Sequence, residues 1–92
     1  MNETAPAMTP IGHADFLAAQ HGDKNAFARL VLSTQKAVAS IALAVTRDVQ
    51  LSEDIAQNAY TKAWQRLPSM QNPESFLPWL REVTRNEAID HV

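Results

Sequence analysis

Apolar side chains recur at intervals of three, four and seven residues through one stretch of the chain, about residues 24–46. They are Phe27, Leu30, Val31, Val38, Ile41, Ala42 and Val45. Because an α-helix repeats about every 3.6 residues, this spacing puts them on one face of a helix. At about 1.5 Å per residue such a helix is about 35 Å long, the length of a small helical domain. We expect it to be the scaffold on which the rest of the chain packs.

Length and composition favour a single all-α domain. The chain has 92 residues and two glycines, which allows one domain at most. No alternating run of Val, Ile and Thr marks a strand, whereas Ala, Leu, Gln and Arg are spread along the whole chain. We expect a flexible N-terminal arm over residues 1–10 and a compact bundle of about four helices over residues 11–92.

Capping residues predict the bounds of the first two helices. Thr9 and Pro10 are typical of a cap and the first helical position, and Gly22 is expected to end this short helix. Asp23 follows as the expected N-cap of the long helix.

The third predicted helix has Ser52 as its N-cap, with Glu53 and Asp54 in a first turn where negative charge suits the helix dipole. Its apolar residues form two rows of four-residue spacing: Ile55, Ala59, Ala63 and Leu67, and beside them Ala56, Tyr60 and Trp64. The opposite face is polar and consists of Asp54, Gln57, Asn58, Thr61, Lys62 and Gln65. Such a helix packs on a core with one side and leaves the other for solvent or a partner.

A turn precedes the last predicted helix. Pro68 and Pro73 bracket it, because each proline biases its predecessor away from helix. Ser75 is the expected cap, which puts Pro78 in the first turn. The apolar face of this helix is Phe76, Leu77, Leu80, Val83, Thr84 and Ile89, and the face turned away from it carries Arg81, Arg85, Asn86 and Asp90. No helix-ending residue follows, so we expect the natural polypeptide to be longer.

Enzyme chemistry finds little support. The chain has no cysteine, which excludes disulfides and Cys-ligated metals. The histidines show no metal-binding spacing, and they are His13, His21 and His91. Two acidic pairs have structural explanations: Glu53/Asp54 as helix-dipole charges and Glu82/Glu87 as solvated surface. We expect no catalytic residue, metal or cofactor.

Membrane insertion and export are not expected either. The most apolar run, Ala37–Val45, is nine residues long and contains Ser40, whereas a membrane span needs about 18–20. The first residues, Met1–Thr4, lack the basic start of a signal peptide. We expect a soluble, cytoplasmic protein.

The charge is unevenly distributed, although the formal net charge of −2 is unusual for a free-standing DNA binder. Four basic residues lie in a 24-residue span without an acidic one: Lys24, Arg29, Lys36 and Arg47. The proline-bounded turn is expected to expose Met70, Gln71 and Asn72. Apolar and amide groups there could hold an unstacked base, and a solvated face with an ordinary loop is the plainer alternative.

A series of short motifs runs along about residues 16–92. They are Gly22-Asp23, Ala26-Phe27, Ser52–Gln57, Ala63-Trp64, Phe76, Trp79-Leu80, Arg85-Asn86 and Asp90. In order and spacing they resemble region 2 of a bacterial RNA polymerase sigma factor, of the extracytoplasmic-function (ECF) group in the sigma-70 family. The resemblance implies a compact helical domain that docks on the clamp coiled coil of the polymerase β′ subunit. It also implies recognition and melting of the promoter minus-ten element, bound as single-stranded DNA, for transcription initiation.

The resemblance also implies which residues bind these partners. Asp54 and Gln57 match the family's polymerase-binding acid and amide, and the same face continues with Asn58, Thr61, Lys62 and Gln65. The family's loop before the last helix, here residues 68–75, accommodates a flipped base of the non-template strand. The implied DNA-binding residues are Met70, Gln71, Asn72, Arg81, Arg85, Asn86 and Asp90. An anti-sigma factor is a further implied partner.

Trp64 and Trp79 match family aromatics, but both lie on apolar stripes, which favours core packing. If fully buried, each ring would contribute about 3–5 kcal/mol to stability.

The chain departs from the family pattern in places. The loop commonly carries an arginine after an aromatic, where this chain has Met70-Gln71, and Asn58 replaces a common acidic residue. Glu82 and Glu87 are expected to lower the positive potential near any DNA path.

The family's second helical domain, which reads the minus-thirty-five element, is absent, so the chain looks like an isolated N-terminal domain. An alternative function is a sigma-derived interaction module that binds polymerase or an anti-sigma factor without reading DNA. A small helical enzyme that uses the histidines is a third possibility.

Overall fold

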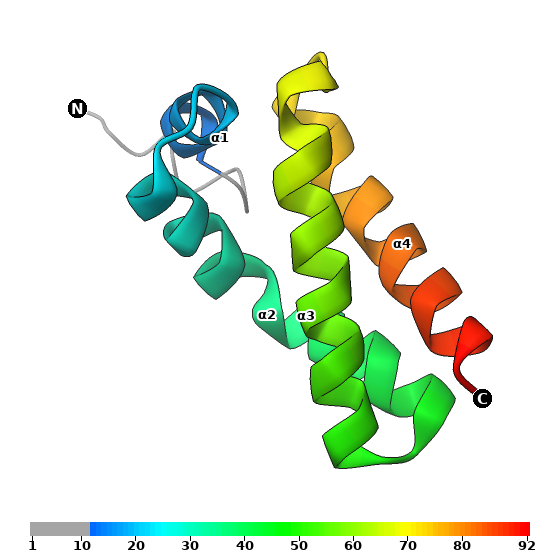
Figure 1. Ribbon diagram of the computed structural model, residues 1–92. Helices are drawn as coiled ribbons and strands as arrows, with labels where there is room; N and C mark the ends of the chain where they lie inside the picture. The colour runs from blue at the N-terminus through cyan, green and yellow to red at the C-terminus, as the bar shows by residue number, and fades with distance from the viewer. Residues whose placement is uncertain (1–11) are drawn as a thin grey trace.

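The computed structural model describes residues 12–92, which form four α-helices and two 3₁₀ turns (Figure 1). The elements are α1 (His13–Gln20), α2 (Lys24–Thr46), α3 (Val49–Arg66), η2 (Leu67–Ser69), η3 (Pro73–Ser75) and α4 (Phe76–Asp90). In Figure 1, α2 crosses behind α3, and α1 lies at the same end of the molecule as the turn between α3 and α4. The all-α prediction is confirmed for the described residues. The predicted arm, residues 1–10, lies outside them.

The junction between α1 and α2 forms as the sequence predicts. Gly22 has a positive φ of 96°, a conformation that glycine adopts without strain. The backbone N–H of Gly22 donates to the carbonyl of Ala19 and that of Asp23 to Ala18, both at 3.0 Å, which is the Schellman arrangement of a helix end. The Asp23 carboxylate then accepts the N–H of Ala26 at 3.1 Å and caps α2. One glycine and one aspartate thus end α1 and start α2 within two residues.

The start of α1 is less well defined by the sequence. Gly12 occupies the N-cap position and offers no side chain to cap the helix. The cap predicted at Thr9, with Pro10 after it, lies outside the described residues.

α3 begins earlier than predicted. Its N-cap is Asp48, whose carboxylate accepts the backbone N–H three residues later at 3.0 Å. The predicted cap, Ser52, is instead buried, and its hydroxyl donates to the carbonyl of Val49 at 2.7 Å. Glu53 and Asp54 therefore stand beyond the first turn, so the prediction that they complement the helix dipole there is wrong.

The core forms where α2 and α4 pack against the apolar row of α3. Every member of this row is fully buried, as predicted: Ile55, Ala59, Ala63 and Leu67. α2 contributes Leu30 and Val38, and α4 contributes Phe76 and Leu80. At one end, the rings of Phe16 and Phe76 pack edge to face with their centroids 6.1 Å apart. Burial of these side chains supplies most of the stabilisation of a domain this small.

α2 is the helix that the other three contact. It is long and apolar enough to cross a membrane by length and composition, yet α1, α3 and α4 all pack against it. At its middle, Thr34 Oγ1 lies 2.7 Å from the hydroxyl of Tyr60 on α3. These contacts are those of the central helix of a bundle.

α4 begins at Phe76, as predicted, with Pro78 in its first turn. Ser75 does precede the helix but does not cap it. Its hydroxyl donates to the side-chain oxygen of Asn72 at 2.8 Å. The role predicted for Ser75 as a cap is therefore wrong, because its hydroxyl is used inside the turn.

The buried stripe of α4 differs from the prediction at its end. Ile89 was expected in the core but is 52% exposed, whereas Ala88 is fully buried and Glu87 is only 8% exposed. One residue is about 100° of helix, so the stripe that passes through Leu80 and Thr84 reaches Glu87 and Ala88 and misses Ile89. Glu87 is therefore not solvated surface.

The two tryptophans are half-buried rather than fully buried. Trp79 packs against the core, and Trp64 packs against Phe27 with ring centroids 5.0 Å apart. The stabilisation expected for a fully buried ring therefore does not apply to either.

We predict that Phe76→Ala lowers the free energy of unfolding by about 3–5 kcal/mol, because the ring is fully buried and the structure around the resulting cavity relaxes only partially. Leu32→Ala, at a position that is 65% exposed, is the control and should stay within about 0.5 kcal/mol of wild type. Urea titration followed by circular dichroism measures both. Equal losses for the two variants would contradict this core assignment.

Candidate functional site

The polar residues predicted on one side of α3 all lie exposed there, opposite the buried row. This surface, the outer face of α3, comprises Asp54, Gln57, Asn58, Thr61, Lys62 and Gln65. Apart from Lys62, which pairs with the buried Glu87, these side chains take no part in the core. The structure thus brings the predicted polymerase-binding residues onto one surface, and their binding role stays a prediction.

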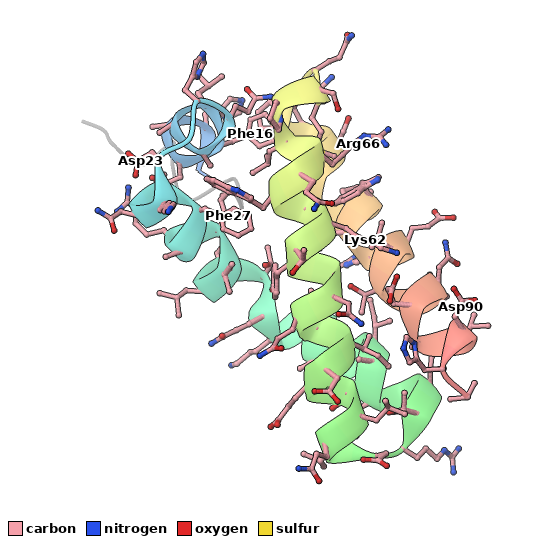
Figure 2. All side chains as sticks on the ribbon, in the orientation of Figure 1. Phe16, Asp23, Phe27, Lys62, Arg66 and Asp90 are labelled. Atoms are coloured by element: carbon pink, nitrogen blue, oxygen red, sulfur yellow. The ribbon has the colours of Figure 1, made fainter. Side chains whose placement is uncertain are left out.

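Two residues at the edge of the outer face contact α4. The Lys62 ammonium pairs with the carboxylate of Glu87, and Figure 2 shows Lys62 on the side of α3 toward α4. Asn58 also hydrogen-bonds to Glu87. The contact with Glu87 does not involve the other members of the outer face, which are Asp54, Gln57, Thr61 and Gln65.

The environment of Glu87 favours its charged form. Its pKa is lowered mainly by the hydrogen bond from Lys62, with help from the charges of Lys62 and His91 and from Asn58, while burial opposes the shift. The negative charge is therefore balanced locally. The expectation that Glu87 lowers the positive potential near a DNA path stays a prediction, and the charge that it neutralises is that of Lys62.

A hollow of about 380 Å³ opens between the end of α3, the turn and α4. We call it the turn hollow. It is lined by Arg66, Ser69, Met70, Gln71, Asn72, Ser75 and Trp79. The structure therefore brings together the three predicted turn residues, although Met70 is half-buried against the core and not exposed as expected.

Arg66 and Trp79 line the turn hollow but were not among the predicted site residues. Arg66 comes just before the proline-bounded turn, and Trp79 lies four residues after its end. Their closeness to the turn in sequence was the available signal. Whether a helix residue faces a turn depends on the angle between the helices, which a single sequence does not give.

The predicted DNA-binding residues of α4 lie on two flanks of the helix. Asn86 and Asp90 follow Trp79 after seven and eleven residues, so they continue the side that faces the turn hollow. Arg81 lies roughly 140° around the helix from Asn86. All four residues are exposed, as predicted for this face, but the arginines lie toward one edge of it and Asn86 and Asp90 toward the other.

Arg81 and Arg85 instead face α2. With Ala37, Ser40 and Ile41 they line a second hollow, of about 300 Å³.

The basic stretch of α2 is only partly free, because Arg29 forms an ion pair with Asp15 of α1, with 3.0 Å between Nε and Oδ1. 

An apolar hollow of about 420 Å³ lies between α2 and α3. Phe27, Tyr60 and Trp64 form most of its wall, with Lys24 and Thr61 beside them. Thr61 also belongs to the outer face of α3, so the two surfaces are continuous.

The histidines lie apart from one another. His13 is 3.7 Å from the carboxylate of Glu74, while ring nitrogens of His21 and His91 contact backbone carbonyls of their own helices at 2.8 Å and 2.7 Å. Within residues 12–92, no group of three or more His, Asp or Glu side chains is placed to hold a metal ion.

Residues 30–92 match the family model described as Sigma-70 region 2. The matched part runs from α2 to the end of the chain and includes the outer face of α3 and the turn hollow. No solved structure matches the chain at the level of significance that the relatives below reach.

Several curated proteins are similar to the chain. The "Probable RNA polymerase sigma factor RfaY" of Xanthomonas campestris pv. campestris is 53% identical over 78 residues, which is 85% of this chain and 20% of that protein. The RNA polymerase sigma-H factor of Pseudomonas aeruginosa is 34% identical over 73 residues, and the ECF RNA polymerase sigma-E factor of Escherichia coli K12 is 35% identical over 75. Both alignments cover 79% of this chain and 38% of the relative. The chain thus spans less than half the length of these relatives.

We predict that Glu87→Gln destabilises the domain by about 0.5–1 kcal/mol at pH 7, because Lys62 is half exposed and can rehydrate. The folded-state pKa of Glu87 lies below its ordinary value of 4.5. Its contribution is therefore present at neutral pH and is lost as the pH falls through the folded-state value. Thermal unfolding at several pH values should show the gap between wild type and variant closing in acid.

Glu82→Gln is the matched control, since it removes one carboxylate from the exposed side of α4 and should stay within about 0.5 kcal/mol of wild type at pH 7. A gap between wild type and Glu87→Gln that persists at the same size in acid would contradict the ion pair.

Proposed function

The chain belongs to the sigma-70 family as a region 2 domain, and from this we propose that it is the part of an RNA polymerase sigma factor that docks on the polymerase and reads the minus-ten element. In this role it is a non-enzymatic, cytoplasmic initiation factor. The β′ clamp coiled coil is its protein partner, and the single-stranded non-template strand is its DNA partner. An anti-sigma factor is a further proposed partner.

The outer face of α3 carries the docking proposal. It offers carboxylate, amide and hydroxyl groups in consecutive helical turns, all exposed and none used by the domain's own core. A helix of a coiled coil can lie along such a row and hydrogen-bond to it, as in polar protein interfaces. Asp54 and Gln57 are free of the contact with Glu87, which makes them the strongest candidates to bind the partner directly.

The turn hollow supports the DNA proposal. Enzymes and binding proteins that hold an unstacked base combine stacking with hydrogen bonds to the edge of the base. Here Trp79 supplies an aromatic ring, Gln71 and Asn72 supply amides, and Arg66 supplies a cation. Asn86 and Asp90 extend the same side of α4, so the strand would run from the hollow along that side. Arg81 and Arg85 would contact phosphates on the other side of the helix.

A module that binds only polymerase or an anti-sigma factor is the alternative. The observation in its favour is electrostatic. The net charge is −2, and the arginines of α4 lie on a different flank from Asn86 and Asp90. Weak DNA binding by the isolated chain would nevertheless be compatible with recognition of the minus-ten element, if polymerase presents the melted strand.

We predict that Asp54→Ala and Gln57→Ala each weaken binding to the β′ clamp coiled coil about tenfold, because each removes a hydrogen-bonding group at the interface. Isothermal titration calorimetry against the purified coiled coil measures this. Glu82→Ala and Gln35→Ala are the controls, since both residues are exposed and lie on other helices, α4 and α2. Equal losses in the control variants, or none in the test variants, would contradict docking through this face.

We predict that Asn86→Ala weakens binding of single-stranded DNA about tenfold, because it removes an amide from the side of α4 that continues the turn hollow. Fluorescence anisotropy with labelled single-stranded decamers of random sequence is the measurement. Asn25→Ala, at an exposed position on α2, is the control. Unchanged DNA binding by Asn86→Ala, with docking on the coiled coil intact, would favour the interaction module.

A further inference from the structure

The carboxamide of Gln20 joins α1 to the turn between α3 and α4. Its Nε2 donates to the backbone carbonyl of Leu67 at 2.9 Å and to that of Met70 at 2.7 Å. An amide nitrogen has two hydrogens, so both are used on the turn. These two carbonyls belong to the first residue of η2 and to Met70, the residue that follows η2, whose own N–H donates to the carbonyl of Leu67 at 3.1 Å. The side chain of Gln20 thus bridges two carbonyls of the turn from a different helix, α1.

The rest of α1 lies along the same turn. His13, at the other end of the helix, is 3.7 Å from Glu74 in η3, and the ring of Phe16 packs on Phe76 just after it. Figure 1 shows α1 beside the turn, at the end of the molecule opposite the C-terminus. α1 also precedes residues 30–92, which the family model matches. The contact therefore joins the turn to a helix that lies before the part of the chain matched by the family model.

Met70 is the point at which this contact meets the turn hollow. The backbone of Met70 is extended, with ψ 144°, so the chain leaves η2 there and continues into Gln71 and Asn72. The Met70 side chain packs on the core, and its carbonyl is held by Gln20. Because the side chain and the carbonyl of Met70 are both held, the point from which the chain continues into Gln71 and Asn72 is held as well. These two residues line the hollow.

We propose that Gln20 is a positioning residue for the turn hollow: it holds η2 and Met70 so that Gln71 and Asn72 face an unstacked base. The inference rests on the proposed function of the hollow in binding single-stranded DNA. Gln20 itself does not contact the base. It acts by reducing the number of conformations that the turn samples before the strand binds, and preorganisation of this kind raises affinity.

The test replaces Gln20 with methionine, which keeps the length of the side chain and removes both donors. We expect Gln20→Met to bind labelled single-stranded decamers about tenfold more weakly, the effect of losing one or two hydrogen bonds, with binding to the β′ clamp coiled coil unchanged. We also expect the backbone amides of Met70 and Ser75 to exchange with solvent about tenfold faster, while those in the middle of α2 and α3 keep their rates.

Two further variants make the result specific. Gln20→Glu keeps the shape of the side chain but places oxygens against the two carbonyls, so its effect on DNA binding should equal or exceed that of Gln20→Met. Gln35→Glu introduces the same charge at an exposed site on α2 and reports the loss that charge alone causes. Gln20→Glu must therefore bind DNA more weakly than Gln35→Glu.

Two results would overturn the inference. One is DNA binding by Gln20→Met at the wild-type level. The other is an equal loss of DNA and coiled-coil binding with faster exchange throughout the domain, which would make Gln20 a residue of general stability. If wild type itself binds no single strand, the proposed function of the hollow fails and this inference fails with it, whereas a defect confined to the variants leaves the proposed function standing.

Discussion

The packing of α2 and α4 against one row of α3 determines the rest of the structure. Two of the four side chains in that row, Ala59 and Ala63, are alanines with no exposed surface. Small side chains at a helix contact let the backbones approach closely, so a core of few residues can be dense enough to hold a domain of this size. Because the row uses one side of α3 fully, the opposite side can stay polar without loss of stability. The outer face is a consequence of this packing.

Polar contacts between helices then connect the two proposed binding surfaces. Lys62 on α3 pairs with Glu87 on α4, and Gln20 on α1 holds the turn that links these two helices. The outer face and the turn hollow are thus built on the same pair of helices. A partner bound along α3 would leave the side of α4 with Asn86 and Asp90 open, which suits a domain that receives a DNA strand after docking.

Local patterns were enough to predict the helices and the exposed polar surfaces. The four-residue rows of α3 and the Gly22-Asp23 junction depend on neighbours in sequence, and both were confirmed. Predictions failed where a choice depended on distant residues. Asp48 and Ser52 are equally good caps, and the buried position of Ser52 decides between them. From its sequence neighbours Glu87 is predicted to be exposed, because its partner Lys62 lies on another helix. No sequence neighbour of Gln20 indicates that its side chain hydrogen-bonds to the turn.

We infer that one small domain presents two separate binding surfaces, one for the polymerase coiled coil and one for single-stranded DNA. Backbone amide chemical shifts, followed by NMR while each partner is added and then both together, test it most directly. We expect the coiled coil to shift amides along the outer face of α3 and DNA to shift those of residues 68–75 and of α4 near Asn86. Both sets should shift when both partners are present. Displacement of one partner by the other, or shifts of the same residues with either, would contradict it.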